Sequence, residues 1–279
     1  MENREPVMPL TAVQRNILAL LARNRAPDSY LAGGAALHMS PNSIRYSNDL
    51  DFFHDSSERV ADAFRDDSAL LADSAYQVDV ELSQPGFIRA VVATAGDVTR
   101  IDWAHDSAWR FLPPIRDEFG GFVLHEMDLA INKVLALAGR DEPRDYVDML
   151  YVEQHLLPLG AVVWAAAGKD PGFTPLSLLE LLKRRGKQRQ EELDRLHLAR
   201  PIDVRSAKEA WLSALAGADE FVRSRPPDEV GALYYDSQRR AFAAPTPGTP
   251  LEEQGLALHF GMPGGVLPQP VPRSLAPDS

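Results

Sequence analysis

Residues 31–37 read Leu-Ala-Gly-Gly-Ala-Ala-Leu, and residues 45–53 read Arg-Tyr-Ser-Asn-Asp-Leu-Asp-Phe-Phe. The first stretch predicts a short strand, a glycine turn and a helix that begins directly after the turn. The second stretch predicts a strand, and because side chains alternate across a strand, Asp49 and Asp51 project from one face. Together the two stretches predict an α/β unit that combines a glycine turn with a pair of carboxylates.

The paired carboxylates need a partner of opposite charge. Like charges at neighbouring positions repel each other unless a proton or a cation lies between them. The chain contains no cysteine, so a metal ion has to be held by oxygen or imidazole ligands. Asp49 and Asp51 are therefore candidate ligands for Mg²⁺, or Mn²⁺, that also contacts substrate phosphates. An Asp-x-Asp pair by itself is more typical of a solvated strand face.

Gly33 and Gly34 are the second candidate feature. Without β-carbons, the backbone N–H groups of this turn can approach a phosphate, and the N-terminus of the following helix favours an anion there. A Gly-Gly pair alone is more often an ordinary tight turn. The prediction of a phosphate site therefore depends on the combination of this turn with the Asp-x-Asp strand.

The remaining pattern divides the chain into two parts and a tail. Residues 1–125 alternate helices with strands, which predicts an α/β domain with a mixed sheet. Residues 126–244 have helical periodicity, with predicted helices that include Gln188–His197 and Asp228–Ala241. In residues 245–279 prolines are dense, so we expect this tail to be largely extended or disordered. The sequence thus predicts an α+β protein, with a C-terminal α-helical bundle that completes the active-site cleft.

Charge is unevenly distributed along the 279 residues, whose net charge is −11. Residues 1–158 carry 25 acidic and 14 basic side chains, whereas residues 159–245 carry 12 acidic and 14 basic ones. The net charge argues against a protein that coats nucleic acid with its whole surface, but the second segment is the better candidate to contact a polyanion. The sequence has no apolar run of membrane-spanning length and no apolar N-terminal signal, so we expect a cytoplasmic protein.

A Gly-Gly turn followed about a dozen residues later by Ser-x-Asp-x-Asp on a strand resembles the signature of the DNA polymerase β-like nucleotidyltransferase superfamily. A closer resemblance is to the AbiEii/AbiGii (MenT-like) toxins, which show Gly-Gly-[Thr/Ala]-Ala-Leu and Arg-x-Ser-x-Asp-Leu-Asp-Phe-Phe segments. Both segments occur here nearly intact, and the family's downstream pattern is matched at Lys133, Arg140 and residues 144–148. The resemblance covers residues 28–155.

The resemblance implies roles for the residues of these motifs. The implied nucleotide-binding residues are Gly33, Gly34, Arg45, Ser47 and Lys133. An acidic residue after Lys133 also belongs to the site, and we favour Asp148 over Asp145. Asp102 takes the place of a third carboxylate, as general base or third metal ligand. Plainer interpretations stay open: a snorkelling surface lysine at position 133, a surface pair at residues 144–145, and a turn aspartate at position 102.

The resemblance also implies a function. The expected activity is that of a magnesium-dependent toxin of a type IV-like toxin–antitoxin system, which transfers a nucleoside monophosphate from an NTP to RNA. The expected acceptor is the 3′ end of tRNA, pyrophosphate is released, and a cognate antitoxin protein is the expected partner. Two alternatives remain, namely transfer to a small-molecule or protein hydroxyl, and an inactive module that binds nucleotide or antitoxin.

The candidate RNA contacts lie in a basic run over residues 183–189. They are Arg184, Arg185, Lys187 and Arg189. Such a run can neutralise a phosphate backbone, although basic residues at a helix end also interact favourably with the helix dipole.

Overall fold

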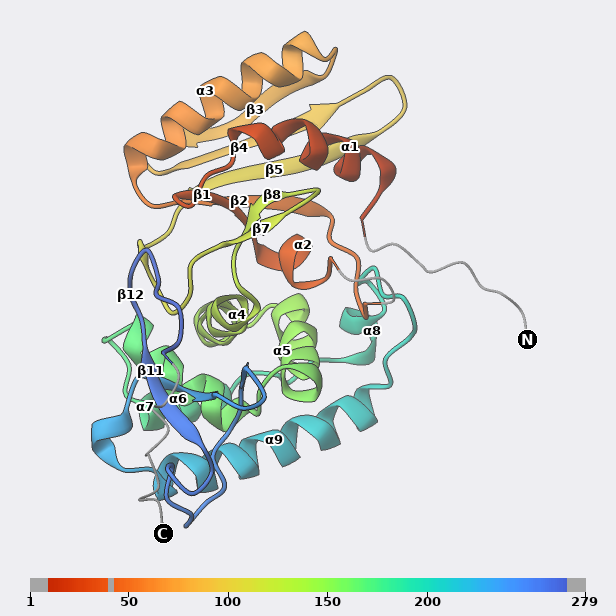
Figure 1. The fold of residues 1–279 in the computed structure, drawn as a ribbon. Coiled ribbons are helices and arrows are strands. Elements are labelled where there is room, and N and C mark those ends of the chain that lie inside the picture. Colours follow the sequence, from red (N-terminus) through yellow and green to blue (C-terminus); the bar gives the residue numbers. More distant parts are fainter. Residues whose placement is uncertain (1–9, 40–42, 270–279) are drawn as a thin grey trace, which may run out of the picture.

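A mixed seven-stranded sheet occupies the N-terminal part of the computed structural model, which describes residues 10–39 and 43–269 (Figure 1). Its strands are β1 Ser29–Ala32, β2 Asp49–His54, β3 Gln77–Gln84, β4 Phe87–Ala93, β5 Val98–His105, β7 Ile115–Asp117 and β8 Gly121–Val123. The strand order is β3-β4-β5-β2-β1-β8-β7, with β2 parallel to β5 and β1 parallel to β8. The predicted mixed sheet is confirmed.

Helices cover both faces of this sheet. Helices α1 (Ala12–Leu21) and α3 (Ser57–Asp73) pack on one face, and the short α2 (Gly33–Leu37) packs on the other (Figure 1). Thr11 and Ser56 cap α1 and α3, because each hydroxyl oxygen accepts a hydrogen bond from a backbone N–H of the first turn. The caps fix where both helices begin, and packing against the strands holds them on the sheet face opposite α2.

Strand β2 shows the predicted alternation of side chains. Leu50 and Phe52 are fully buried on one face, while Asp49 and Asp51 lie on the other face with intermediate exposure. In the parallel pairing of β2 with β5, Asp51 lies opposite Asp102. Two neighbouring strands thus present carboxylates on the same face of the sheet.

Helices form most of the second part of the chain. Their bounds are α4 Glu126–Arg140, α5 Pro143–His155, α6 Leu159–Lys169, α7 Pro175–Leu182, α8 Gln190–Leu193 and α9 Val204–Ser224. Helix α6 is buried from Leu159 to Ala167 and packs against α4, α7 and α9. Helix α4 also packs against α2, so its side chains lie close to the face of the sheet that carries the carboxylates.

Two helices predicted in this part differ in the structure. The segment Asp228–Ala241 is not a helix but contains strand β9 (Ala232–Asp236), because Gly231 adopts φ +84° and lies against Gly168. The segment Gln188–His197 is helical only over α8, since the residues after α8 leave the helix to pair with the backbone of residues 44–46.

The expectation of a disordered tail is wrong for residues 256–263. Leu256–Phe260 forms strand β11, which pairs with β9 in a second sheet of order β10-β9-β11, where β10 is Ala241–Phe242. Strand β12 (Met262–Pro263) pairs with β6 (Trp109–Arg110). Strand β11 buries Leu256 and His259 and leaves Leu258 and Phe260 exposed, so it lacks the period-two alternation by which a strand is predicted from sequence. Residues 270–279 lie outside the described residues.

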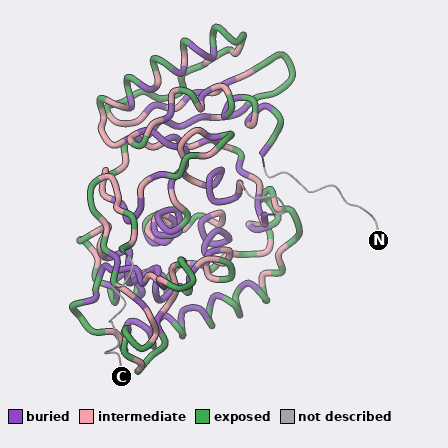
Figure 2. The backbone as a smooth tube through the Cα atoms, in the orientation of Figure 1, coloured by how far each residue is buried: buried purple, intermediate pink, exposed green. Residues whose placement is uncertain are grey.

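Buried residues concentrate along the central strands and around α4 and α6, whereas the outer face of α9 is exposed (Figure 2). Among the helices that the structure describes, none combines the length and the apolar character needed to cross a membrane.

Candidate active site

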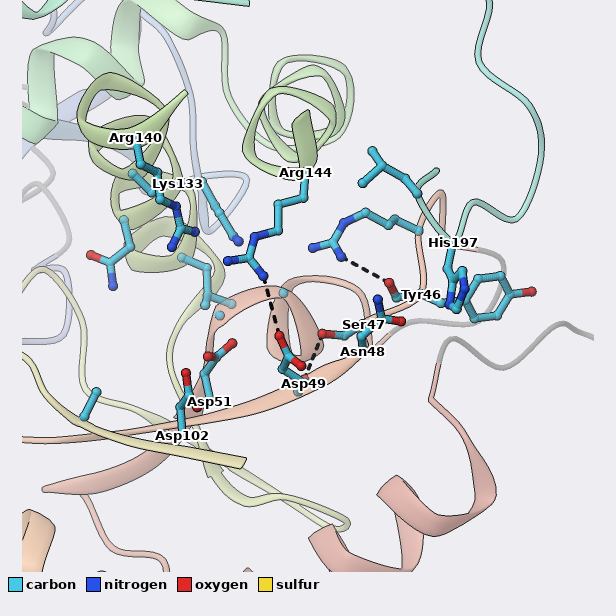
Figure 3. Close-up of a pocket in the computed structure, with 18 of the residues that line it drawn as sticks. Tyr46, Ser47, Asn48, Asp49, Asp51, Asp102, Lys133, Arg140, Arg144 and His197 are labelled. Atoms are coloured by element: carbon cyan, nitrogen blue, oxygen red, sulfur yellow. Dashed lines mark hydrogen bonds and ion pairs between the residues drawn. The ribbon is translucent and has the colours of Figure 1, made fainter. Parts of the chain in front are cut away.

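A cavity of about 340 Å³ opens between the carboxylate face of the sheet and helices α4 and α5 (Figure 3). Its walls combine residues of the glycine turn, β2, β4, β5, α4 and α5 with a segment that follows α8. The charged residues of the wall are Arg45, Asp49, Asp51, Arg89, Asp102, Lys133, Arg140, Arg144 and Arg195. The cavity therefore gathers three carboxylates and six cations from distant parts of the sequence.

Asp51 lies against the glycine turn. A β-carbon added at Gly33 would lie 1.9 Å from Asp51 Oδ2, and Gly33 has φ +64°, so this position requires glycine for space and for conformation. The Asp51 carboxylate makes no hydrogen bond or ion pair with any residue that the structure describes. Burial raises the pKa of Asp51, Lys133 counteracts this effect, and the neighbouring Asp102 and Asp49 add to it.

Arginines hold the other two carboxylates. Arg100 Nη2 donates to Asp49 Oδ2 at 2.6 Å, and Arg144 Nη1 lies 3.5 Å from the same oxygen. Arg89 binds both oxygens of Asp102, at 2.8 and 2.6 Å. These contacts place positive charge where the sequence predicts a metal ion.

The residues of this face suit a hard cation. Three carboxylates from β2 and β5 supply only oxygen ligands, which Mg²⁺ and Mn²⁺ prefer, and Asp51 lacks any other partner in the described part of the chain. Within residues 10–39 and 43–269, no three His, Asp or Glu side chains are already arranged at the spacing of a metal site. Asp49 and Asp102 would have to exchange their arginine contacts for a cation.

Asp148 lies behind the cavity wall and does not line it. Its fully buried carboxylate accepts hydrogen bonds from Arg45 Nε at 2.8 Å and Arg45 Nη2 at 3.0 Å, and Lys133 Nζ lies 2.7 Å away. His38 Nε2 donates to Asp148 at 2.8 Å. Burial opposes ionisation of Asp148, but Lys133, Arg45 and His38 outweigh it and hold the pKa well below its ordinary value. Asp148 is placed to position Lys133 and Arg45.

Asp145 is also fully buried and has a similar position. Arg140 binds both of its oxygens, at 2.6 and 2.9 Å, and Lys133 Nζ lies 3.4 Å from Oδ1. The interpretation of Arg144 and Asp145 as a surface pair does not hold, because Asp145 turns to Arg140 while Arg144 turns to the cavity. Lys133 is no surface lysine either, since its side chain is only 8% exposed.

Ser47 and Gly34 take part in the backbone architecture of the wall. Ser47 Oγ donates to the carbonyl of Asp49 at 2.8 Å and so fixes the start of β2. A β-carbon at Gly34 would lie 2.4 Å from the Arg45 guanidinium, which is itself held by Asp148. Both residues line the cavity.

One part of the wall could not be expected from the motifs. Residues 195–197, which follow α8, close the cavity beside Tyr46 (Figure 3). The backbone N–H of Tyr46 donates to the carbonyl of His197 at 2.8 Å, and the N–H of Ala199 donates to the carbonyl of Ile44 at 2.9 Å. This strand-like pairing joins segments that are far apart in the chain, and no local sequence pattern signals it.

The predicted RNA contacts lie on the loop between α7 and α8, at one edge of a second cavity of about 360 Å³. Arg185 Nε donates to the carbonyl of Ala138 at 3.3 Å, and the N–H of Gly186 donates to Asp141 at 3.1 Å. The loop is therefore anchored at the C-terminal end of α4, next to Arg140 of the first cavity. Lys187 and Lys208 line the second cavity without any ion pair to the described residues.

The sequence profile of the nucleotidyl transferase AbiEii toxin, assigned to type IV toxin–antitoxin systems, matches residues 18–229. The chain belongs to this family. It is thus a nucleotidyltransferase and a toxin of a type IV toxin–antitoxin system, which implies an NTP substrate and an antitoxin partner in general terms. No curated protein matches the sequence.

One solved structure shows a similar fold. MenT4, a nucleotidyltransferase toxin from Mycobacterium tuberculosis, is similar with a TM-score of 0.52 and 17% identity, over 77% of this chain and 83% of that chain. JHP933 from Helicobacter pylori matches with a TM-score of 0.43 and 17% identity, over 76% of this chain and 92% of that one. A further H. pylori structure matches with a TM-score of 0.42 and 17% identity, over 77% of this chain and 98% of that one.

Proposed function

We propose that this toxin transfers a nucleoside monophosphate from an NTP to the 3′ end of an RNA, with tRNA as the acceptor, and releases pyrophosphate. Mg²⁺ or Mn²⁺ is the proposed cofactor, with Asp49 and Asp51 as its ligands. The observation that carries this proposal is the Asp51 carboxylate, which has no partner among the described residues and lies beside Asp49 and Asp102, against a turn that only glycine can form.

The opposite wall of the cavity supports the binding of a triphosphate. Lys133, Arg140 and Arg144 project from α4 and α5 toward the carboxylates (Figure 3). A triphosphate between the two walls would meet positive charge on one side and, through a bound cation, on the other. When bound, the metal ion supplies charge neutralisation for the phosphates and the leaving pyrophosphate.

The chain's own residues have distinct proposed roles in this reaction. Lys133 and Arg45, both fixed by Asp148, offset the negative charge that develops on the phosphates in the transition state. Asp102, held beside Asp51, acts either as a third carboxylate of the cation site or as the acceptor of the hydroxyl proton. Ser47, Gly33 and Gly34 shape the nucleotide-binding wall.

Both parts of the chain contribute residues to the proposed active site. We propose residues 1–125 as the nucleotide-binding domain and residues 126–244 as the domain that completes the cleft, because the cavity wall includes α4, α5 and the segment after α8. We further propose that the acceptor lies along the basic loop between α7 and α8. This loop meets the C-terminal end of α4, where Arg140 enters the cavity.

The acceptor proposal is tested by replacing the basic loop's four cations, Arg184, Arg185, Lys187 and Arg189, with glutamine. The K_M for tRNA should rise, and the salt dependence of tRNA binding should become less steep, because fewer counterions are released. The affinity for NTP should remain nearly unchanged. A matched control replaces four exposed arginines elsewhere: Arg65, Arg116, Arg223 and Arg239.

The control has the same change in net charge, so it should leave the K_M for tRNA within about twofold of the wild-type value if the loop binds RNA locally. An equal rise of K_M in both variants would reject the loop as the acceptor site. Labelling of a protein or a small molecule, but of no RNA, would reject the tRNA assignment and retain the nucleotidyl transfer.

A further inference from the structure

Arg144 is the least firmly held guanidinium among the paired cations of the first cavity. It lies in the first turn of α5, its side chain is 39% exposed, and its only ion pair in the described chain is the 3.5 Å contact with Asp49. Its Nε is buried and has no hydrogen-bond partner among the described residues. Most of the donor capacity of Arg144 is therefore unused while the side chain points into the cavity (Figure 3).

Four of the other five cations of the wall are bound more completely, and the fifth, Arg195, makes no ion pair with the described residues. Arg45, Arg89 and Arg140 each bind both oxygens of one carboxylate, at distances between 2.6 and 3.0 Å. Lys133 lies 2.7 Å from the fully buried Asp148. A phosphate that drew one of these side chains away would leave a buried carboxylate without its partner, which is costly, so these four cations act on the phosphates from their present positions. Arg144 can move at much lower cost, because a single long contact near solvent contributes little.

We propose that Arg144 is a triphosphate-binding residue that exchanges partners: it contacts Asp49 in the free protein and phosphate oxygens when a cation occupies Asp49. This inference rests on the proposed role of Asp49 as a cation ligand. The planar guanidinium can bind two phosphate oxygens at once, and the position of Arg144 opposite the carboxylate wall directs it to that place. The carboxylate wall is thereby kept neutralised before substrate arrives.

The exchange gives Arg144 opposite effects on two ligands. Arg144 and a divalent cation are both positive and compete for Asp49, so removing the guanidinium should strengthen binding of the cation alone. The same removal takes two potential hydrogen bonds from the triphosphate, so it should weaken binding of that ligand. A residue with only a structural role would not change the two affinities in opposite directions.

Arg100 provides a matched control on the same carboxylate. It donates to Asp49 at 2.6 Å, closer than Arg144, but it does not line the cavity. Replacing Arg100 should therefore strengthen cation binding without weakening triphosphate binding. The pair of variants separates competition for Asp49 from contact with the phosphates.

The experiment uses the full-length wild-type protein, Arg144→Gln, Arg144→Lys and Arg100→Gln. Binding of Mn²⁺ alone is measured by electron paramagnetic resonance, and binding of inorganic triphosphate in saturating Mg²⁺ is measured by calorimetry. Arg144→Gln should bind Mn²⁺ about threefold to tenfold more tightly and triphosphate about tenfold more weakly than wild type. Arg144→Lys should retain near-wild-type Mn²⁺ affinity and recover part of the triphosphate affinity.

Arg100→Gln should show the gain for Mn²⁺ and a triphosphate affinity within about twofold of wild type. Melting temperatures of all variants establish that they are folded. If Arg144→Gln bound both Mn²⁺ and triphosphate with wild-type affinity, or bound both more weakly, the proposed exchange of partners by Arg144 would be rejected. The proposed metal site at Asp49 would not be affected by that result. Failure of the wild-type protein to bind Mn²⁺ would overturn the proposed function together with this inference.

Discussion

Replacing Asp148 with asparagine should lower the free energy of unfolding by about 3–5 kcal/mol, whereas replacing Asp51 with asparagine should not lower it. Asp148 is fully buried and contacts Lys133 Nζ at 2.7 Å and Arg45 Nε at 2.8 Å. The side chains of Arg45 and Lys133 are 7% and 8% exposed. Asparagine retains an acceptor oxygen but no charge, so both cations would remain buried without a counter-charge.

Asp51 differs because no partner would be lost. It has no ion pair in the described part of the chain, and its partly buried position beside Asp102 and Asp49 raises its pKa. Burial and like charges thus disfavour its ionised form, and an uncharged side chain of the same shape removes that cost. The stability of Asp51→Asn should equal or exceed that of wild type, by up to about 1 kcal/mol.

Urea titrations at pH 7 measure these differences, and their pH dependence adds a second test. The pKa of Asp148 is lowered in the folded state, so its contribution is complete above the unfolded value of about 3.9 and is lost as the pH falls below it. The deficit of Asp148→Asn should therefore persist from pH 8 to about pH 4 and shrink only at lower pH. A deficit below 1 kcal/mol for Asp148→Asn, with a large one for Asp51→Asn, would refute this division of roles.

Two further predictions concern backbone features. Gly33→Ala should abolish nucleotidyl transfer and destabilise the fold by about 1–3 kcal/mol, because the added β-carbon would lie 1.9 Å from Asp51 Oδ2 and the φ of Gly33 is +64°. The control Gly139→Ala should remain active, because a β-carbon at Gly139 meets no atom within 4 Å. An active Gly33→Ala would contradict the close approach of Asp51 to the glycine turn. Truncation after residue 244 should lower the melting temperature, because it removes strand β11 with the buried Leu256. It also removes the 2.9 Å hydrogen bond between His259 and the Phe111 carbonyl. An unchanged melting temperature would show that β11 contributes nothing to stability.

The parts of the fold that the sequence predicted are those with a local physical cause. The alternation over β2 follows from a period of two residues, so the shared face of Asp49 and Asp51 could be inferred before any register was known. The sequence did not predict strand β9. Gly231 precedes this strand with a positive φ and packs against Gly168, and this close approach is a tertiary contact that local sequence does not reveal. Periodicity alone could not distinguish that segment from a helix.

The candidate site shows the same limit. Asp49, Lys133 and the glycine turn were singled out by their motifs, but the partners of these residues depend on strand register and helix packing. Arg100 meets Asp49 only because β2 and β5 pair in parallel at that position. Asp148 was predicted near the site, yet whether its carboxylate faces the cavity or the core depends on how α5 packs.

The proposed function requires that Asp49 and Asp51 support metal-dependent nucleotidyl transfer. The most direct measurement incubates purified protein with Mg²⁺, tRNA and each of the four α-³²P-labelled NTPs, and follows label in RNA together with released pyrophosphate. We expect the wild-type protein to label the tRNA 3′ end, and EDTA, Asp49→Asn or Asp51→Asn to abolish both products while circular dichroism remains that of the folded protein. Transfer at the wild-type rate by either variant would contradict a catalytic role for the Asp49 and Asp51 carboxylates.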